Sequence, residues 1–455
     1  MSKLPVIAIF DVGKTNKKLL LFNEDYDVIY ESSTQLKEIT DEDNFPCEDI
    51  HALTKWVKES FAQINNDHRF AIRALNFSGY GASFVLLEKN LKPFLPLYNY
   101  LKPYPDVLKE KFYHTYDGQE IIAKQTASPV LGNLNSGMQL YRLKYERPQA
   151  FNNIKCALHL PQYLSFIFTG KLYSELTSIG CHTGLWDFGH QQYHEWVVKE
   201  EIDKKLAAIV NDPIGGYVDE NIPVGIGLHD SSAALIPYLI SFSEPFVLLS
   251  TGTWCISLNP FNHTPLSGEE LRKDCLCYLS YKGEAIKASR LFAGYEHEQQ
   301  IRRLGVYFNK SSDYYKSVTY DSSLVSKNLF EPKDFKNIPL VVGQSAFEQK
   351  DLSSFENYEA AYHQLIWDII IQQVHSTNIV LKDTIAKRIF VDGGFSNNPV
   401  YMQLLTKAFY KLEIYAAEIS SASALGPALC MHQHWNTKDL RQNFIRVKRY
   451  YQEKD

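Results

Sequence analysis

The sequence lacks any apolar run that approaches the ~20 residues of a membrane-spanning helix. It also lacks an excess of positive charge, because 47 Lys and Arg stand against 52 Asp and Glu, for a net charge of −5. The start, MSKLPVIAIFDVGKT, reaches Asp11 after a very short apolar run, so no secretory signal is expected. These absences argue against a nucleic-acid or membrane partner and favour a cytoplasmic protein.

Cysteine is scarce, and its spacing along the chain does not predict disulfides. The seven residues are scattered along the chain: Cys47, Cys156, Cys181, Cys255, Cys275, Cys277 and Cys430. An odd, dispersed set is typical of free thiols in a reducing compartment. Cys275 and Cys277 form the only close pair, and without a second pair or an HExxH motif they do not predict a metal site.

The length of 455 residues exceeds one ordinary core, since domains average roughly 150 residues. Hydrophobic residues make up 45% of the chain, which is typical of a globular protein. No linker is of low complexity, and the polar segment 241–245 is the best boundary. We therefore expect two domains, 1–242 and 243–455, and leave a homodimer open.

Three segments have the pattern of two strands around a glycine-containing turn: 5–23, 71–88 and 244–260. The first and third, centred on Gly13 and Gly252, open the two halves of the chain. This indicates a duplication of two α/β halves. The alternative is that any two buried hairpins with a central glycine look alike.

Helical spacing of apolar residues predicts the longest helix at 355–380. A second helix is expected over 151–170, where Gly170 is a C-cap signal. A strand at 388–392 leads into Gly393-Gly394, and small residues over 420–430 predict a helix.

The segment Asp11-Val-Gly-Lys-Thr-Asn-Lys-Lys18 has the composition of a polyphosphate-binding turn. Glycine permits close backbone approach, and polar and basic residues supply donors and charge: Gly13, Lys14, Thr15, Asn16 and Lys18. Asp11, at a strand end, suits the water shell of Mg²⁺. A P-loop is excluded, because Ala8 stands where that motif needs glycine. An ordinary hairpin turn is the alternative.

Two later turns could hold the rest of a nucleotide. Ser250-Thr-Gly-Thr-Trp254 is rich in hydroxyls, and the 393–397 turn joins a strand to a helix. The residues that we expect to contact ATP there are Thr251, Gly252, Thr253, Gly393, Gly394 and Asn397. No GxGxxG motif is present, so a dinucleotide site is not supported.

Asp230 follows the glycine-spaced loop PVGIGLH and begins a helix. Phosphoryl transfer to a hydroxyl needs a carboxylate that accepts the proton, and an aspartate at a loop–helix junction is well presented for this. The alternative is that Asp230 only caps the helix at Ser231.

In this order the motifs resemble the FGGY family of carbohydrate kinases over nearly the whole chain, and most closely its rhamnulokinase branch. Gly81-Ala-Ser-Phe-Val-Leu-Leu-Glu88, His229-Asp-Ser-Ser-Ala-Ala234 and Ser250–Trp254 resemble family motifs. Gly393–Asn397 and Ala422-Ser-Ala-Leu-Gly426 do so as well. Five matches in order make chance an unlikely explanation.

The resemblance implies an α/β fold of two actin-like ATPase (ribonuclease H-like) domains that flank a catalytic cleft. The N-terminal domain, 1–242, is expected to bind the sugar and carry Asp230 as the base, and the C-terminal domain, 243–455, to bind ATP with Mg²⁺. By their motif positions, Tyr80, Gly81, Ser83 and His229 are expected to line the sugar pocket. His229 could instead orient Asp230.

The sequence departs from the family pattern at several positions. Lys14 stands where threonine is common, Ser83 where the rhamnulokinase branch has aspartate, and Ser421 where an acidic residue precedes Ala422. Asp392 begins what is a glycine triplet in the family.

The residues before Ser83 bear on the substrate. Tyr80 and Ala82 replace the Gln and His of the xylulokinase branch, which speaks against xylulose. We expect a 6-deoxy ketose such as L-rhamnulose or L-fuculose. The alternatives are another ketose or polyol, and a non-catalytic ATP- or sugar-binding regulator on the same scaffold.

Overall fold

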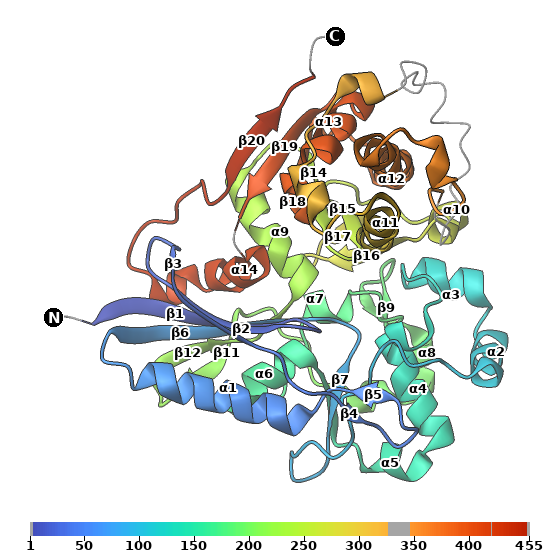
Figure 1. The fold of residues 1–455 in the computed structure, drawn as a ribbon. Coiled ribbons are helices and arrows are strands. Elements are labelled where there is room, and N and C mark those ends of the chain that lie inside the picture. Colours follow the sequence, from blue (N-terminus) through green and yellow to red (C-terminus); the bar gives the residue numbers. More distant parts are fainter. Residues whose placement is uncertain (1–2, 326–345, 420, 453–455) are drawn as a thin grey trace. The chain divides into compact units, whose positions relative to one another are not determined.

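The computed structural model describes residues 3–325, 346–419 and 421–452, and the chain divides into two compact units (Figure 1). Unit 1 comprises Met1–Ser241, Cys277–Ala285 and Ser420–Phe444, and unit 2 comprises Phe242–Leu276, Ile286–Ile419 and Ile445–Asp455. The first division lies beside the expected boundary at 242/243. The simple two-half division needs correction, however, because two segments of the second half fold with unit 1.

The main sheet of unit 1 has the strand order β11-β12-β6-β1-β2-β3, with β13 paired to β6. Strand β1 pairs antiparallel with β2 and parallel with β6, so the 5–23 hairpin forms as predicted. The strands are β1 (Leu4–Val12), β2 (Lys17–Phe22), β3 (Val28–Thr34), β6 (Phe70–Gly79), β11 (Ile214–Val218), β12 (Ile222–Gly225) and β13 (Leu228–His229).

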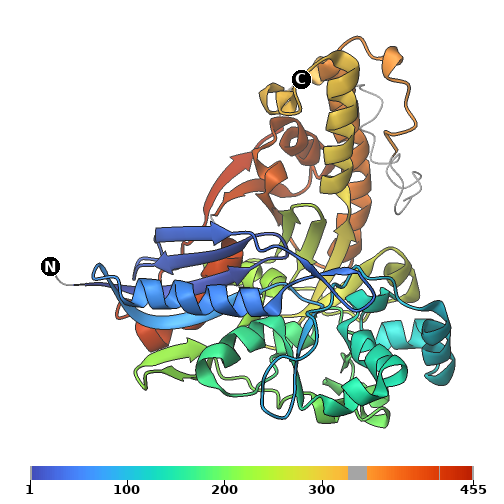
Figure 2. The same cartoon turned by 60° about the horizontal axis from the view of Figure 1, so that its bottom comes forward.

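Helices cover both faces of this sheet (Figures 1 and 2). Val6, Ala8 and Phe10 share a core with α1 (Ile50–Asn65) and α6 (Leu160–Thr169). Because side chains alternate along a strand, Ile7 and Ile9 face the opposite side. There α14 (Ala422–Cys430) packs on β1 and against α9 (Asp230–Ser241). The apolar strands therefore account for a sheet buried on both faces.

The rest of unit 1 forms a second core around Phe112, Tyr141 and Trp196. Its helices and those that connect it are α2 (Asp106–Thr115), α3 (Gln119–Gln125), η1 (Gly132–Leu134), α4 (Ser136–Glu146), α5 (Pro148–Asn153), α7 (Leu176–Ile179), α8 (Glu195–Lys199) and η2 (Asp203–Lys205). Helix α15 (His432–Trp435) packs instead on the main sheet, where it contacts β6. Its short paired strands are β4 (Ile39–Thr40) with β5 (Pro46–Cys47), β7 (Phe84–Leu87) with β8 (Cys156–His159), and β9 (Trp186–Asp187) with β10 (Gln192–Tyr193).

The second large sheet has the order β16-β17-β15-β14-β18-β19-β20. Its strands are β14 (Phe246–Thr251), β15 (Cys255–Asn259), β16 (Cys275–Leu279), β17 (Ala285–Leu291), β18 (Arg388–Gly393), β19 (Glu413–Glu418) and β20 (Arg446–Tyr450). Strand β14 has an antiparallel partner, β15, and a parallel partner, β18, as β1 has β2 and β6. The shared arrangement is the one that the predicted duplication requires.

The helices of unit 2 include the long helix that the sequence predicts over 355–380. It is α12 (Tyr358–Leu381), 24 residues long, and Asn357 caps it by accepting a hydrogen bond from the Ala360 N–H. The others are α10 (Gly268–Arg272), α11 (Ala293–Phe308), η3 (Tyr314–Ser317), η4 (Ser322–Leu324), η6 (Leu352–Ser354), η7 (Gly394–Asn397) and α13 (Pro399–Ala408).

Two local predictions were wrong. Residues 71–88 do not form a hairpin, because β7 pairs with β8 instead of β6. Residues 151–170 are not one helix, since β8 separates α5 from α6. Gly170 does end α6 in the left-handed conformation, with φ 64°. In both cases the partner strand is distant in sequence, so local pattern could not reveal it.

Within the described ranges, no helix is both long and apolar enough to cross a bilayer. The seven cysteines all lie in the described ranges, and none of them is joined to another by a disulfide. The same residues contain no cluster of three or more His, Cys, Asp or Glu side chains suited to a metal ion, and Cys275 and Cys277 belong to none.

Candidate active site

The turn between β1 and β2 is the first predicted phosphate-binding element. The Gly13 N–H donates to the Asn16 carbonyl oxygen at 3.0 Å and closes the turn. Thr15 and Asn16 are exposed, and Gln35 Nε2 donates to Asn16 Oδ1 at 2.9 Å. The turn thus presents backbone and polar groups at the end of two buried strands.

Both lysines predicted to supply charge are already paired. Lys14 contacts Glu38 at 2.9 Å and Lys18 contacts Glu31 at 2.9 Å. These pairs are partly exposed, and such pairs contribute little to stability. Neither lysine is therefore held strongly by its present partner.

Asp11 is the next-to-last residue of β1 and lies near the predicted base. Ser423 Oγ, on α14, donates to Asp11 Oδ2 at 2.8 Å. Burial, reinforced by the negative charge of Asp230, raises the pKa of Asp11 to about 6. Sequence analysis missed Ser423, because α14 was assigned to the other domain.

Asp230 begins α9, and Asp230 Oδ1 accepts a hydrogen bond from the Ser231 N–H at 2.6 Å. The helix-capping alternative is therefore realised in part, but the side chain is still 34% exposed. His229 Nε2 lies 3.3 Å from the same oxygen. An exposed carboxylate with a histidine at its base suits proton transfer to or from a small molecule.

His229 is buried beneath Asp230, and its burial lowers the pKa of the imidazole. Cys181 Sγ lies 3.0 Å from His229 Nε2, a contact that no sequence motif indicated. A Cβ added at Gly81 would lie 2.8 Å from the same ring, so this position needs glycine. The placement favours the alternative in which His229 orients Asp230 instead of lining a pocket.

The other residues predicted to line the sugar pocket lie close by but mostly face inward. Tyr80 is 7% exposed, and its hydroxyl donates to Glu48 Oε2 at 2.5 Å. Ser83 is 1% exposed, and its hydroxyl donates to the Tyr98 carbonyl oxygen at 3.3 Å. Ala82 adopts φ 60°, which turns the chain between them.

Tyr100 is a further residue near the base that the sequence did not single out. Its ring centroid lies 6.2 Å from that of Tyr80. Burial and the charges of Asp230 and Glu48 raise the pKa of its hydroxyl. Tyr100 therefore remains a neutral hydrogen-bond donor near both carboxylates, and no motif could have revealed it.

In unit 2 the two predicted nucleotide-binding turns lie side by side. Thr251 pairs with Gly393 in the β14–β18 register. The Phe395 N–H donates to Thr251 Oγ1 at 3.0 Å, and this threonine also donates to the Asp392 carbonyl oxygen at 2.5 Å. The structure thus joins two motifs that the sequence offered separately.

Close backbone contact explains the glycines around these turns. Gly393 has φ 85°, and a Cβ there would lie 2.0 Å from the Thr251 carbonyl oxygen. A Cβ at Gly294, the second residue of α11, would lie 1.8 Å from the Gly252 carbonyl oxygen, a constraint that sequence analysis missed. The exposed residues that remain available to a ligand are Gly252, Thr253, Gly393, Gly394 and Asn397.

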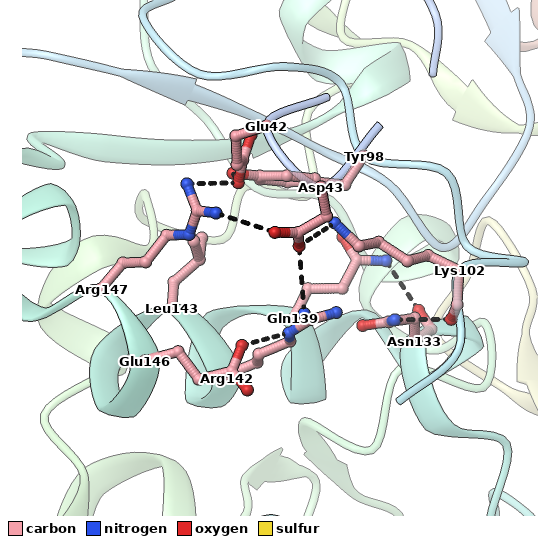
Figure 3. Close-up of a pocket in the computed structure, with 10 residues that line it drawn as sticks. All are labelled: Glu42, Asp43, Tyr98, Lys102, Asn133, Gln139, Arg142, Leu143, Glu146 and Arg147. Atoms are coloured by element: carbon pink, nitrogen blue, oxygen red, sulfur yellow. Dashed lines mark hydrogen bonds and ion pairs between the residues drawn. The ribbon is translucent and has the colours of Figure 1, made fainter. Parts of the chain in front are cut away.

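A separate polar cavity lies between the 42–43 turn and α4 in unit 1 (Figure 3). Its volume is about 20 Å³, room for one water molecule. Its charged groups pair with one another: Arg147 contacts Glu42 at 2.7 Å, and Lys102 contacts Asp43 at 2.6 Å. This cavity is too small for a sugar and is a structural ion-pair network.

Two family models together cover most of the chain. The N-terminal domain of the FGGY family of carbohydrate kinases matches residues 6–237. The C-terminal domain of carbohydrate kinase FGGY matches residues 243–439. A rhamnulokinase from Halalkalibacterium halodurans is 23% identical over 259 residues, which are 54% of this chain and 52% of that protein. The chain thus spans about half the length of the curated relatives that it matches.

Solved structures share the fold. A xylulose kinase from Rhodospirillum rubrum has a TM-score of 0.81 at 14% identity and covers 98% of this chain and 94% of that one. A gluconate kinase from Lactobacillus acidophilus has a TM-score of 0.73 at 17% identity and covers 99% and 94%. The predicted two-domain α/β fold of the actin-like ATPase type is thereby confirmed. The chain belongs to the FGGY family of carbohydrate kinases.

Proposed function

We propose that the protein transfers the γ-phosphoryl group of ATP to a hydroxyl of a small sugar, with Asp230 as the general base. The observation that carries this proposal is the Asp230 carboxylate, 34% exposed at the start of α9 and backed by buried His229. The family membership of the chain supports the reaction class.

The chemistry follows from these groups. The sugar hydroxyl oxygen bonds to the γ-phosphorus, the bond from that phosphorus to the bridging oxygen breaks, and ADP leaves. The hydroxyl proton passes to the Asp230 carboxylate. Because burial lowers the pKa of His229, its neutral imidazole can donate to Asp230 Oδ1 without adding a positive charge that would weaken the base.

We assign the phosphates of ATP to the turns described above. In unit 1 these are the backbone at Gly13, where no side chain blocks close approach, and the side chains of Lys14, Thr15, Asn16 and Lys18. In unit 2 they are the exposed residues Gly252 and Thr253 and the turn at Gly393–Asn397, whereas Thr251, which was also predicted to contact ATP, is buried and its hydroxyl bonds to the second turn. Exposed backbone at glycine lets a polyphosphate approach closely, and the two lysines supply the only formal charge in this set.

The residues present fit a Mg²⁺ ion. Asp11 and Asp230 lie close enough for the negative charge of Asp230 to contribute to the raised pKa of Asp11, and a divalent cation would reduce this repulsion. We propose that Asp11 holds the ion through water, and that the ion neutralises phosphate charge when bound. Ser423, which donates to Asp11, orients that carboxylate.

For the substrate we propose a 6-deoxy ketose such as L-rhamnulose or L-fuculose. The similarity to rhamnulokinases supports it. Tyr80 and Ala82, which flank Gly81 beside His229, are nearly buried (7% and 1% exposed), so the wall at this place offers a sugar few polar partners, which suits a methyl group. Xylulose and gluconate remain the competing acceptors, because kinases for both share this fold.

The deciding experiment measures ADP release with ATP, Mg²⁺ and a panel of L-rhamnulose, L-fuculose, D-xylulose and gluconate. Sugar-dependent ADP release above the rate without acceptor is expected for a ketose. Tight binding of ATP or sugar with no ADP release from any acceptor would instead support a non-catalytic regulator.

A further inference from the structure

A buried ion pair lies beneath the 13–16 turn. The side chains of Lys17 and Glu48 are 3% and 4% exposed, and Lys17 Nζ contacts Glu48 Oε1. Lys17 begins β2, and Glu48 follows β5, so the two come from separate segments of unit 1. Burying two charges costs desolvation energy that their attraction only partly returns, so stability alone is a poor reason for such a pair.

The lysine of this pair holds the phosphate turn. Lys17 Nζ donates to the Lys14 carbonyl oxygen at 2.9 Å. That carbonyl lies inside the turn closed by the Gly13 N–H. The orientation of the turn therefore depends on Lys17, in contrast to Lys14 and Lys18, whose partners lie at the surface.

The carboxylate of the pair, Glu48, also orients Tyr80, which belongs to the proposed wall of the acceptor pocket. Glu48 Oε2 accepts the hydrogen bond from the Tyr80 hydroxyl, while Oε1 faces Lys17. Tyr80 immediately precedes Gly81, where an added Cβ would lie 2.8 Å from the ring of His229 below the base. One carboxylate thus connects the phosphate turn to the wall beside Asp230.

Glu48 is itself firmly placed. Its backbone forms a β-bridge with Leu97. The chain just before it is anchored by Lys102, which contacts Asp41 at 2.5 Å and Asp43 at 2.6 Å; Figure 3 shows the second contact. An anchored carboxylate can fix its two partners, whereas a mobile one could not.

We propose that Glu48 is a positioning residue that, through Lys17 and Tyr80, aligns the phosphate turn with the wall of the acceptor pocket. The proposal rests on the proposed function. It assigns to Glu48 no contact with sugar or phosphate. Removing its charge is therefore expected to misplace both binding elements without removing either one.

The test uses Glu48→Gln, Lys17→Met and Tyr80→Phe, singly and as the pairs that include Glu48→Gln. The matched control is Lys287→Met, which breaks a comparably buried pair with Glu270 (2.8 Å, side chains 2% and 13% exposed) in unit 2. Each is measured for unfolding midpoint, ATP Kd by calorimetry, and kcat and KM for the sugar.

Glu48→Gln is expected to weaken ATP binding and to lower kcat/KM for the sugar, each by about ten- to a hundredfold. Lys17→Met is expected to reproduce the ATP effect and Tyr80→Phe the sugar effect, and neither is expected to add to Glu48→Gln. Lys287→Met is expected to lower the midpoint alone.

Additive effects, or a Glu48→Gln enzyme with wild-type constants, would overturn the proposal. Tyr80→Phe removes a single hydroxyl, so its kcat/KM for the sugar tests whether the Tyr80–Glu48 hydrogen bond positions the pocket wall even if Glu48→Gln fails to fold. If no acceptor supports turnover by the wild type, the proposed function fails. The Kd for ATP still tests whether Lys17 positions the phosphate turn, because weaker ATP binding by Lys17→Met supports this role and unchanged binding refutes it.

Discussion

Replacing Gly393 by alanine tests how the nucleotide-binding turns of unit 2 are built, and Gly394→Ala is its matched control. The two residues are adjacent and exposed. At Gly393 a Cβ would lie 2.0 Å from the Thr251 carbonyl oxygen, whereas at Gly394 the same oxygen would be 3.9 Å away. Only the first substitution collides with the backbone of β14.

The expected cost follows from this geometry. A residue with a Cβ at the backbone angles of Gly393, φ 85° and ψ −153°, costs about 1–3 kcal/mol, because only glycine adopts this region readily. The collision adds to this, because the Thr251 carbonyl belongs to a strand paired on both sides and cannot withdraw freely. We expect Gly393→Ala to lose more than about 2 kcal/mol of unfolding free energy, and Gly394→Ala to stay within about 0.5 kcal/mol of wild type.

The assay combines urea unfolding followed by circular dichroism with calorimetric titration of ATP. Gly394→Ala is expected to keep its stability but to bind ATP about ten- to a hundredfold more weakly, because its methyl group occupies space that the nucleotide approaches. A Gly393→Ala protein as stable as wild type would refute the packing argument. Unchanged ATP affinity in Gly394→Ala would remove Gly394 from the nucleotide site.

Three further outcomes are expected. Asp230→Asn should lower kcat by about 10²–10⁴-fold with unchanged ATP Kd, and near-normal turnover would reduce Asp230 to a helix cap. Burial raises the pKa of Glu175 from 4.5 to about 7, so its neutral form favours the folded state. The contribution of Glu175 to the free energy of unfolding is full below pH 4.5 and is lost as the pH rises to about 7, a change of about 3 kcal/mol. Urea unfolding at pH 5 and 7.5 should detect this change, and Glu175→Gln should abolish it. A 6-deoxy ketose should exceed D-xylulose in kcat/KM by about ten- to a hundredfold, and steady-state kinetics that favour xylulose would reverse the substrate assignment.

The sequence by itself was sufficient for the elements and motifs whose signals are local. Two short apolar runs around the turn at Gly13 predicted the β1–β2 hairpin, and helical spacing predicted α12. The order of short motifs indicated the family, because each motif combines a strand end with a glycine turn or a helix start. Asp230 at the start of α9 is such a case.

Only the tertiary structure decided which distant segments meet. Ser423 reaches Asp11 because α14 packs in unit 1, and Glu48 reaches Tyr80 across a connection with no motif of its own. The 71–88 hairpin prediction failed because β7 pairs with β8, a strand about 70 residues later in the chain. Packing in the whole core selects the partner of a strand, and local sequence does not. Local pattern fixes conformation over a few residues, whereas the hydrogen bonds that orient Asp11 and Tyr80 join side chains far apart in the chain, and only packing brings these together.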